Sequence, residues 1–188
     1  MGYSLAEAAI AAGAKVTLVS GPVNLDPPPN CHLVSVETAD EMYESVMHHI
    51  KDKDVYIGTA AVSDYSPIKP HDSKIKKDGS HSSMVLELKE NRDILHSVSE
   101  LKDRPYVVGF AAETDDLIDN AKKKLNNKSL DLIVANDVSD KNIGFDSDDN
   151  EVTLITQKEQ QLLERQNKKK ISNKIIEFIS GRINDETN

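Results

Sequence analysis

Two segments of small and acidic residues could form a nucleotide pocket, because each lies at the end of an apolar run typical of a strand. The first is GTAAVSDY at residues 58–65, and the second is VGFAAET at residues 108–114. Small side chains let a sugar or base approach the backbone closely, and Asp64 could accept from a ribose hydroxyl or from the water shell of a cation. Phe110 could form a wall against a base. Each segment could instead be a packing turn, with Asp64 as a local cap and Phe110 in the core.

Lysines at two places in the sequence could hold phosphate. The segment KIKK at residues 74–77 would place Lys74 and Lys76 on one side of an extended strand, which suits a polyphosphate or a charge developing on phosphate. Lys124 and Lys128 lie four residues apart at and just past a predicted helix end, where they could neutralise phosphates. The plainer interpretations are an edge strand that its lysines protect from aggregation, and cations that complement a helix dipole.

Several other kinds of chemistry find no support in the sequence. No serine, histidine and acid pattern suggests a nucleophilic triad, Cys31 is the only cysteine, and His48, His49 and His71 lack the spacing of metal ligands. Lys plus Arg is 23 against 32 for Asp plus Glu, and a net charge of −9 argues against a nucleic-acid-coating surface. No apolar run approaches the roughly 18 residues of a membrane span, and no signal peptide opens the chain. We therefore expect a cytoplasmic protein with neither nucleic acid nor membrane as partner.

Strands and helices alternate along the chain. Short β-branched apolar runs predict strands, and amphipathic stretches, some preceded by a capping Thr or Asp, predict helices. The predicted strands span 16–20, 32–36, 55–58, 106–111, 130–135 and 151–156, and the predicted helices span 3–12, 39–51, 93–101, 117–125 and 171–180. Residues 74–87 read as an extended hairpin arm around the turn signal Asp78-Gly79. The sequence thus predicts one α/β domain over residues 1–188, with a doubly wound, mostly parallel Rossmann-like sheet and a protruding hairpin arm.

The predicted order of elements departs from a doubly wound domain at its start. Such a domain begins with a strand and a glycine-rich turn, followed by the first helix, whose N-terminus holds phosphate. Here the first predicted helix begins at Tyr3, directly after Met1 and Gly2. We expect that a first strand and a Gly/Ser-rich phosphate loop are missing from this chain.

Five motifs occur together and in order. They are TLVSGP at 17–22, AAVSDY at 60–65, KIKK at 74–77, VGFAAET at 108–114 and ANDVS at 135–139. As a set they resemble phosphopantothenoylcysteine synthetase, also called phosphopantothenate–cysteine ligase, and the resemblance covers essentially the whole chain. In many bacteria this activity is the C-terminal half of a bifunctional coenzyme A biosynthesis protein, so the resemblance allows for a decarboxylase domain upstream in the full protein.

The resemblance implies an amide-forming ligase. In this family CTP activates the carboxylate of 4′-phosphopantothenate as an acyl-cytidylate and releases pyrophosphate; the amine of cysteine then displaces CMP. Mg²⁺ accompanies the triphosphate. The family is dimeric and its lysine arm reaches toward the active site of the partner, which implies a homodimer here.

The resemblance also implies roles for single residues. The backbone of Gly58, Thr59 and Ala60 and the ring of Phe110 would frame the nucleotide, and Asp64 would hold the ribose or the metal-bound triphosphate. Family members also carry, in the loop before a Met-Gly like Met1-Gly2, an asparagine tied to turnover of the acyl-cytidylate. That loop is absent here, so the resemblance implies the fold more firmly than the complete reaction.

Among the remaining motif positions, Lys74 would stabilise charge during the reaction and is the candidate catalytic residue. Lys124 and Lys128 match lysines on the phosphate side of the family's site. A nucleotide-contacting turn at a helix start matches four residues, Arg92, Asp93, Ile94 and Leu95. Members of the family often have proline at the position of Arg92, and no residue is assigned to a metal.

Two functions of other classes stay open. A Rossmann oxidoreductase using a dinucleotide would need a glycine fingerprint and an acidic residue about 20 positions later, and neither is visible. A noncatalytic subunit that retains the fold would dimerise around an unreactive pocket. The choice between CTP and ATP is open as well, because base selection rests on backbone contacts that side-chain identity does not report.

Overall fold

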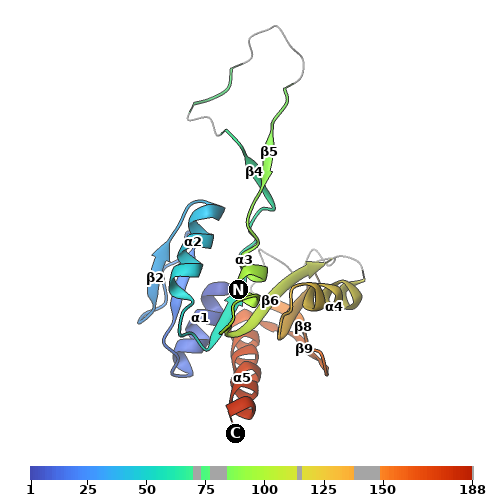
Figure 1. Cartoon of the computed structure of the whole chain (residues 1–188). Helices are drawn as coiled ribbons and strands as arrows, with labels where there is room; N and C mark the ends of the chain where they lie inside the picture. Colours follow the sequence, from blue (N-terminus) through green and yellow to red (C-terminus); the bar gives the residue numbers. More distant parts are fainter. Residues whose placement is uncertain (70–72, 77–83, 114–115, 138–148, 188) are drawn as a thin grey trace.

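The computed structural model describes residues 1–69, 73–76, 84–113, 116–137 and 149–187, and Figure 1 shows how they are arranged. The helices are α1 (Gly2–Ala11), α2 (Ala39–His49), α3 (Ile94–Ser99), α4 (Leu117–Asn127) and α5 (Lys168–Thr187). The strands are β1 (Thr17–Ser20), β2 (His32–Ser35), β3 (Val55–Gly58), β4 (Tyr65–Pro67), β5 (Leu88–Glu90), β6 (Tyr106–Glu113), β7 (Leu132–Asp137), β8 (Asp149–Ile155) and β9 (Gln160–Asn167).

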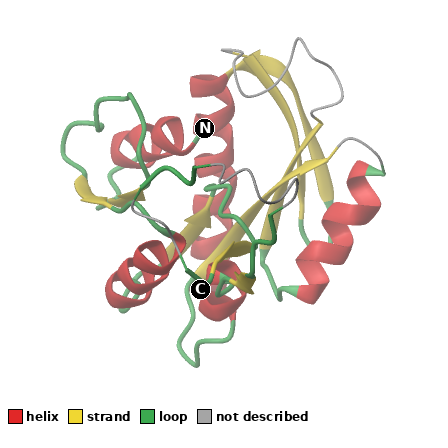
Figure 2. Cartoon of the chain, turned by 90° about the horizontal axis from the view of Figure 1, so that it is seen from above, coloured by secondary structure: helices red, strands yellow, loops and turns green. Residues whose placement is uncertain are grey.

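A mixed five-stranded sheet forms the centre of the molecule, in the order β3-β6-β7-β8-β9. β3, β6 and β7 are parallel, whereas β8 and β9 continue the sheet in antiparallel fashion. Successive residues of a strand point to opposite faces. Val108 and Val134 therefore pack with α1 and α5 on one face, while Val107 and Ile133 pack with α2, α3 and α4 on the other. Helices cover both sides of the sheet (Figure 2), which confirms the predicted α/β fold class.

β1 and β2 form a separate parallel pair, and α2 contacts β1. α2 begins where predicted, because the Thr38 hydroxyl accepts a hydrogen bond from the Glu41 backbone N–H at 3.1 Å and so caps the helix. α1 ends where predicted, just before Gly13, whose φ of 92° is the left-handed conformation that favours glycine after a helix.

The C-terminal part of the fold differs most from expectation. The sequence did not predict β9, because QQLLERQN lacks a clear apolar alternation; β9 is an edge strand with most residues exposed, and only Leu163 is buried. α5 begins at Lys168 rather than Ile171, since the Asn167 side chain accepts from the Lys169 backbone N–H at 2.9 Å and starts the helix earlier. No helix in the described residues is long and apolar enough to span a membrane.

A two-stranded arm, which we define as the described residues 65–69, 73–76 and 84–90, projects away from the sheet and its helices (Figure 1). At its root β4 pairs antiparallel with β5, outside the predicted bounds of 74–87, and the described residues within those bounds, 74–76 and 84–87, form no strand. The predicted turn at Asp78-Gly79 lies outside the described residues. Exposed apolar side chains are concentrated on the arm: Tyr65, Ile68, Ile75, Met84, Val85, Leu86 and Leu88.

Candidate nucleotide site at the strand ends

The two segments of small residues meet at one edge of the sheet. β3 and β6 are parallel neighbours whose register places Gly58 opposite Gly109. Thr59 and Ala60 therefore leave the end of β3 beside the stretch of β6 that contains Phe110. Ligands of doubly wound sheets bind at the carboxyl ends of strands, so this juxtaposition is the arrangement that a nucleotide pocket requires.

The two glycines also have a packing function that the sequence did not reveal. A Cβ on Gly109 would lie 2.8 Å from Leu130 Cδ1 and 3.0 Å from Leu95 Cδ2, and a Cβ on Gly58 would lie 3.2 Å from Leu95 Cδ1. Leu95, on the first turn of α3, thus crosses both strand ends at close range. The glycines bring α3 down onto the sheet, and with it the turn that carries Asp93.

The first turn of α1 reaches the same edge. A Cβ on Gly2 would lie 2.7 Å from Thr59 Oγ1, so the start of this helix lies against the residue that follows β3. Tyr56, two residues before Gly58 on the same strand face, lies under the turn; its hydroxyl would be 3.4 Å from a Cβ on Gly58. Burial and, secondarily, the negative charge of Asp93 raise the pKa of Tyr56 to about 12. The phenol therefore stays protonated at neutral pH, as a hydrogen-bond donor that the sequence had not suggested.

Asp93 joins α3 to the end of α4. Its carboxylate accepts from the His96 backbone N–H at 3.0 Å, which caps α3, and pairs with Lys128 Nζ at 2.7 Å. Burial alone would raise the pKa of Asp93, but the hydrogen bonds from His96 and Lys128 outweigh it and the pKa is lowered. A charged carboxylate–ammonium pair thus lies at the N-terminus of α3.

Lys124 approaches the strand end from the same helix. Its ammonium donates to the carbonyl oxygen of Phe110 at 2.9 Å. The predicted phosphate-side lysines, Lys124 and Lys128, therefore both reach the β3–β6 edge, one at the backbone of β6 and the other at the turn before α3. Side-chain cations at these two points are the donors that a phosphate chain along this edge would need.

Asp64 lies at the root of the arm and is exposed. Its carbonyl oxygen accepts from the backbone N–H of Asn91 at 2.8 Å, and the Asn91 side chain donates to the carbonyl of Ser63, also at 2.8 Å. Asn91 therefore ties the segment that leaves β3 to the segment that enters α3. Neither Asn91 nor Tyr56 belongs to a motif that the sequence analysis used.

Two predicted site residues lie apart from this cluster. Lys74 is exposed on the arm, between β4 and β5 in the chain, and within the described residues no ion pair or hydrogen bond connects it to the strand ends. Arg92 turns toward α2, where its guanidinium lies 2.6 Å from Glu44 Oε1 and stacks 3.8 Å above the ring of Tyr43. Asn136, which the motif set also included, is the next-to-last residue of β7, and its buried Oδ1 lacks a partner in the described part of the chain.

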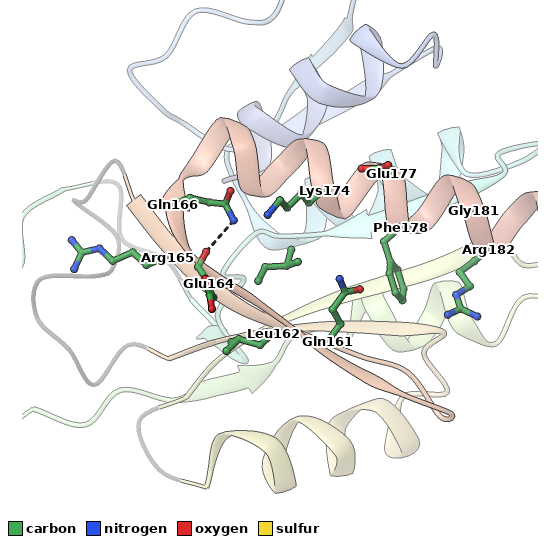
Figure 3. A pocket seen from close by; sticks show the side chains of 11 residues that line it. Gln161, Leu162, Glu164, Arg165, Gln166, Lys174, Glu177, Phe178, Gly181 and Arg182 are labelled. Carbon is green, nitrogen blue, oxygen red and sulfur yellow. Dashed lines mark hydrogen bonds between the residues drawn. The ribbon is translucent and has the colours of Figure 1, made fainter.

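A groove of about 870 Å³ lies elsewhere, between β9 and α5 (Figure 3). Leu162 and Gln161 border it from the strand, and Lys174, Phe178 and Arg182 from the helix. None of the residues predicted to bind nucleotide lines this groove. It therefore plays no part in the strand-end site.

Residues 1–182 match the family described as the DNA/pantothenate metabolism flavoprotein C-terminal domain. The chain belongs to this family. The bifunctional coenzyme A biosynthesis protein CoaBC of Escherichia coli K12 is 41% identical over 188 residues, and that of Bacillus subtilis 168 is 48% identical over 157 residues. These alignments cover 99% and 82% of this chain but 46% and 38% of the relatives. The chain thus spans less than half the length of the curated relatives it matches.

Solved structures agree with the family assignment. The crystal structure of the C-terminal domain of a CoaBC protein superposes with a TM-score of 0.81 at 38% identity, covering 98% of this chain and 82% of that one. The Streptococcus pneumoniae DNA/pantothenate metabolism flavoprotein has a TM-score of 0.78 at 23% identity, covering 96% and 86%. A Cab2 mutant in complex with phosphopantothenate-cysteine has a TM-score of 0.74 at 16% identity, covering 98% and 77%. The last two show a shared fold.

Proposed function

We propose that this chain is the nucleotide-binding ligase domain that joins 4′-phosphopantothenate to cysteine in coenzyme A biosynthesis, with CTP as the activating co-substrate. The observation that carries the proposal is the register of β3 and β6, which brings both small-residue motifs together beside Lys124 and Lys128 in a chain of this family. Relatives named as coenzyme A biosynthesis proteins support the pathway, and a neighbour bound to phosphopantothenate-cysteine supports the product.

The reaction would proceed in two steps. The carboxylate oxygen of 4′-phosphopantothenate attacks the α-phosphorus of CTP, the bond to the bridging oxygen breaks, and pyrophosphate leaves. The cysteine amine then attacks the acyl carbon of the mixed anhydride, loses a proton, and expels CMP as the amide bond forms. Both steps place developing negative charge on phosphate, which cations stabilise best in a site that excludes water.

The proposed roles of this chain's residues follow from their positions. The backbone after β3, at Gly58, Thr59 and Ala60, and the ring of Phe110 would enclose the nucleoside, as expected from the sequence. Lys124 and Lys128 would neutralise phosphate oxygens. To do so, Lys128 must either contact the phosphate while it stays paired with Asp93 or break that ion pair.

Mg²⁺ would enter as part of the metal–CTP substrate rather than as a resident ion. No group of three or more acidic, histidine or cysteine side chains in the described residues could hold a metal. Mg²⁺ is commonly held by substrate phosphates and only one or two carboxylates, which fits a single acidic residue such as Asp64. Asp64 would then contact either the ribose or the water shell of this ion.

Lys74 would act across a homodimer. It is exposed on an arm that projects from its own domain (Figure 1), whereas Lys124 and Lys128 reach the β3–β6 edge. The apolar side chains exposed along the arm favour a second copy as the surface that covers them. In this arrangement the arm of one chain would bring Lys74 to the reacting phosphate of the other.

The proposal is tested by binding and by product formation. CTP, ATP, NADPH and FMN are compared in a thermal-shift assay with Mg²⁺; a ligand at 100 times its Kd raises the free energy of unfolding by about 2.7 kcal/mol. The expected result is stabilisation by CTP together with formation of CMP that requires both 4′-phosphopantothenate and cysteine. Lys74→Ala should reduce this turnover without loss of the fold. A shift with NADPH alone would favour an oxidoreductase, and CTP binding without any CMP would favour a noncatalytic subunit.

A further inference from the structure

The root of the arm is held from the side by one face of α2. Asp40, Tyr43 and Glu44 are spaced i, i+3 and i+4, so they share that face. Asp40 pairs with Lys89 of β5 at 3.0 Å, and Glu44 pairs with Arg92 at 2.6 Å. Every contact joins α2 to the strand of the arm that returns to the domain, or to the residues directly after it.

Arg92 is the centre of this network. It reaches both carboxylates, with Asp40 at 3.5 Å and Glu44 at 2.6 Å, and its guanidinium carbon Cζ lies over Tyr43, 3.8 Å from the ring centroid. Hydrogen bonds from Lys89 and the charges of both cations lower the pKa of Asp40, so this carboxylate stays ionised at neutral pH. A planar cation with several donors is suited to such combined pairing and stacking, which a lysine cannot reproduce.

The two sides of the root are also tied to each other. Asn91 bonds through its backbone N–H to the Asp64 carbonyl and through its side chain to the Ser63 carbonyl, both at 2.8 Å. Because Asn91 directly precedes Arg92, a displacement of Arg92 also moves the segment after β3 that contains Ser63 and Asp64. The arm itself makes no contribution to either core cluster of the described residues, so these contacts at its base set its direction.

We propose that the α2 face of Asp40, Tyr43 and Glu44 is a clamp that fixes the direction in which the arm leaves the domain, and that Arg92 is a positioning residue acting through this clamp. A small rotation at the root moves the far end of the arm by much more, so the clamp determines where Lys74 lies. The consequence for catalysis rests on the proposed function; the effect on arm direction does not.

The structural part is tested by distance measurement between two spin labels. Cys31 is replaced by Ser, and labels are placed at Ser73→Cys on the arm, outside its exposed apolar side chains, and at Lys122→Cys on α4, both exposed positions. Dilution with unlabelled protein removes distances between copies. Arg92→Gln is expected to broaden or shift the distance distribution, and the double variant Asp40→Asn, Glu44→Gln should do the same from the α2 side.

A matched control breaks a surface ion pair elsewhere. Glu7→Gln removes the pair between Glu7 and Lys169 at 3.2 Å, which lies between α1 and α5, and should leave the distribution unchanged. Molar salt should broaden the distribution of the parent chain, because the screening length falls to about 3 Å at 1 M. If Arg92→Gln and the α2 double variant both match the parent, the clamp does not exist.

Activity separates positioning from nucleotide contact. Arg92→Gln should lower kcat about ten-fold while the Kd for CTP stays within two-fold, since misplacement by about 1 Å costs up to a hundred-fold. Arg92→Lys should recover part of kcat, and Lys74→Ala with Arg92→Gln should be no slower than Lys74→Ala alone. A weakened Kd for CTP with an unchanged distance distribution would make Arg92 a nucleotide ligand instead. If no variant makes CMP, the proposed function fails while the distance measurement still decides the clamp.

Discussion

At the scale of single residues, Asp93 makes two contacts in the candidate site, whereas the sequence predicted only its place at a helix start. The sequence placed it at a helix start, and that part is confirmed by its hydrogen bond to the His96 backbone. The sequence could not show that the same carboxylate also binds Lys128, because the pairing depends on how α3 and α4 pack on the sheet. One side chain thus both starts α3 and holds a predicted phosphate-binding lysine.

Replacing Asp93 separates these two functions. Asp93→Ala should lower the free energy of unfolding by about 1 kcal/mol, the usual cost of losing an N-cap. Asp93→Asn should lose less, because asparagine caps equally well and only the partly exposed pair with Lys128 is removed. Chemical denaturation of the three proteins measures this order, and equal losses for both variants would mean that the charge pair, not the cap, dominates.

The lowered pKa of Asp93 gives stability a pH dependence of known sign. A carboxylate whose folded pKa lies below its ordinary value of 3.8 stabilises the fold above that value, and the stabilisation is lost as pH falls through the folded pKa. As the pH falls below about 4, the parent should therefore lose more stability than Asp93→Asn does. Urea denaturation at a series of pH values tests this. Parallel curves for the two proteins would contradict it.

At the scale of elements, the candidate nucleotide site is built by close packing of α3 on two strand ends. The rule that ligands bind at the carboxyl ends of strands predicted that both motifs would lie at strand ends. That β3 and β6 are direct neighbours was not predicted, because the order of strands in a sheet depends on how the helices pack on it. The sequence did not indicate that Gly58 and Gly109 make room for Leu95, because a glycine near a ligand and a glycine under a helix look alike in a sequence.

Alanine at each glycine should give effects of different size. Gly109→Ala brings a Cβ within 2.8 Å of Leu130 and 3.0 Å of Leu95, and overpacking of this kind costs about 1–3 kcal/mol. Gly58→Ala meets Leu95 only at 3.2 Å, so its strain is smaller and is offset by the lower chain entropy of alanine in a strand. Denaturation midpoints should rank Gly109→Ala below Gly58→Ala.

A double-mutant cycle identifies Leu95 as the cause. In a Leu95→Ala background the cost of Gly109→Ala should shrink, because one of the two side chains that meet the new Cβ is gone. An additive cycle would place the strain entirely on Leu130. The thermal shift with CTP, measured on the Gly109→Ala and Leu95→Ala variants, shows whether the position of α3 matters for ligand binding.

At the scale of the whole molecule, the fold and the arm were predictable for different reasons. The order of most strands and helices follows from short apolar runs that alternate with amphipathic segments. These signals missed the short strands β4 and β5 and the polar strand β9 at the edge of the sheet. The arm was visible as lysines around a turn signal. Its anchoring on α2 was not, because Arg92 lies 48 residues from Glu44 in the chain and nothing local pairs them.

The exposed side chains of the arm make a prediction about assembly. Val85 is 88% exposed and Leu86 56% exposed, and neither belongs to the core clusters of the described residues. If a second copy covers them, Val85→Asp with Leu86→Asp should convert a dimer to a monomer, because a buried unpaired carboxylate is costly. Leu25→Asp, at a 61% exposed loop position away from the arm, should stay dimeric. Sedimentation velocity at several concentrations distinguishes the species, and an arm variant that remains dimeric would place the interface elsewhere.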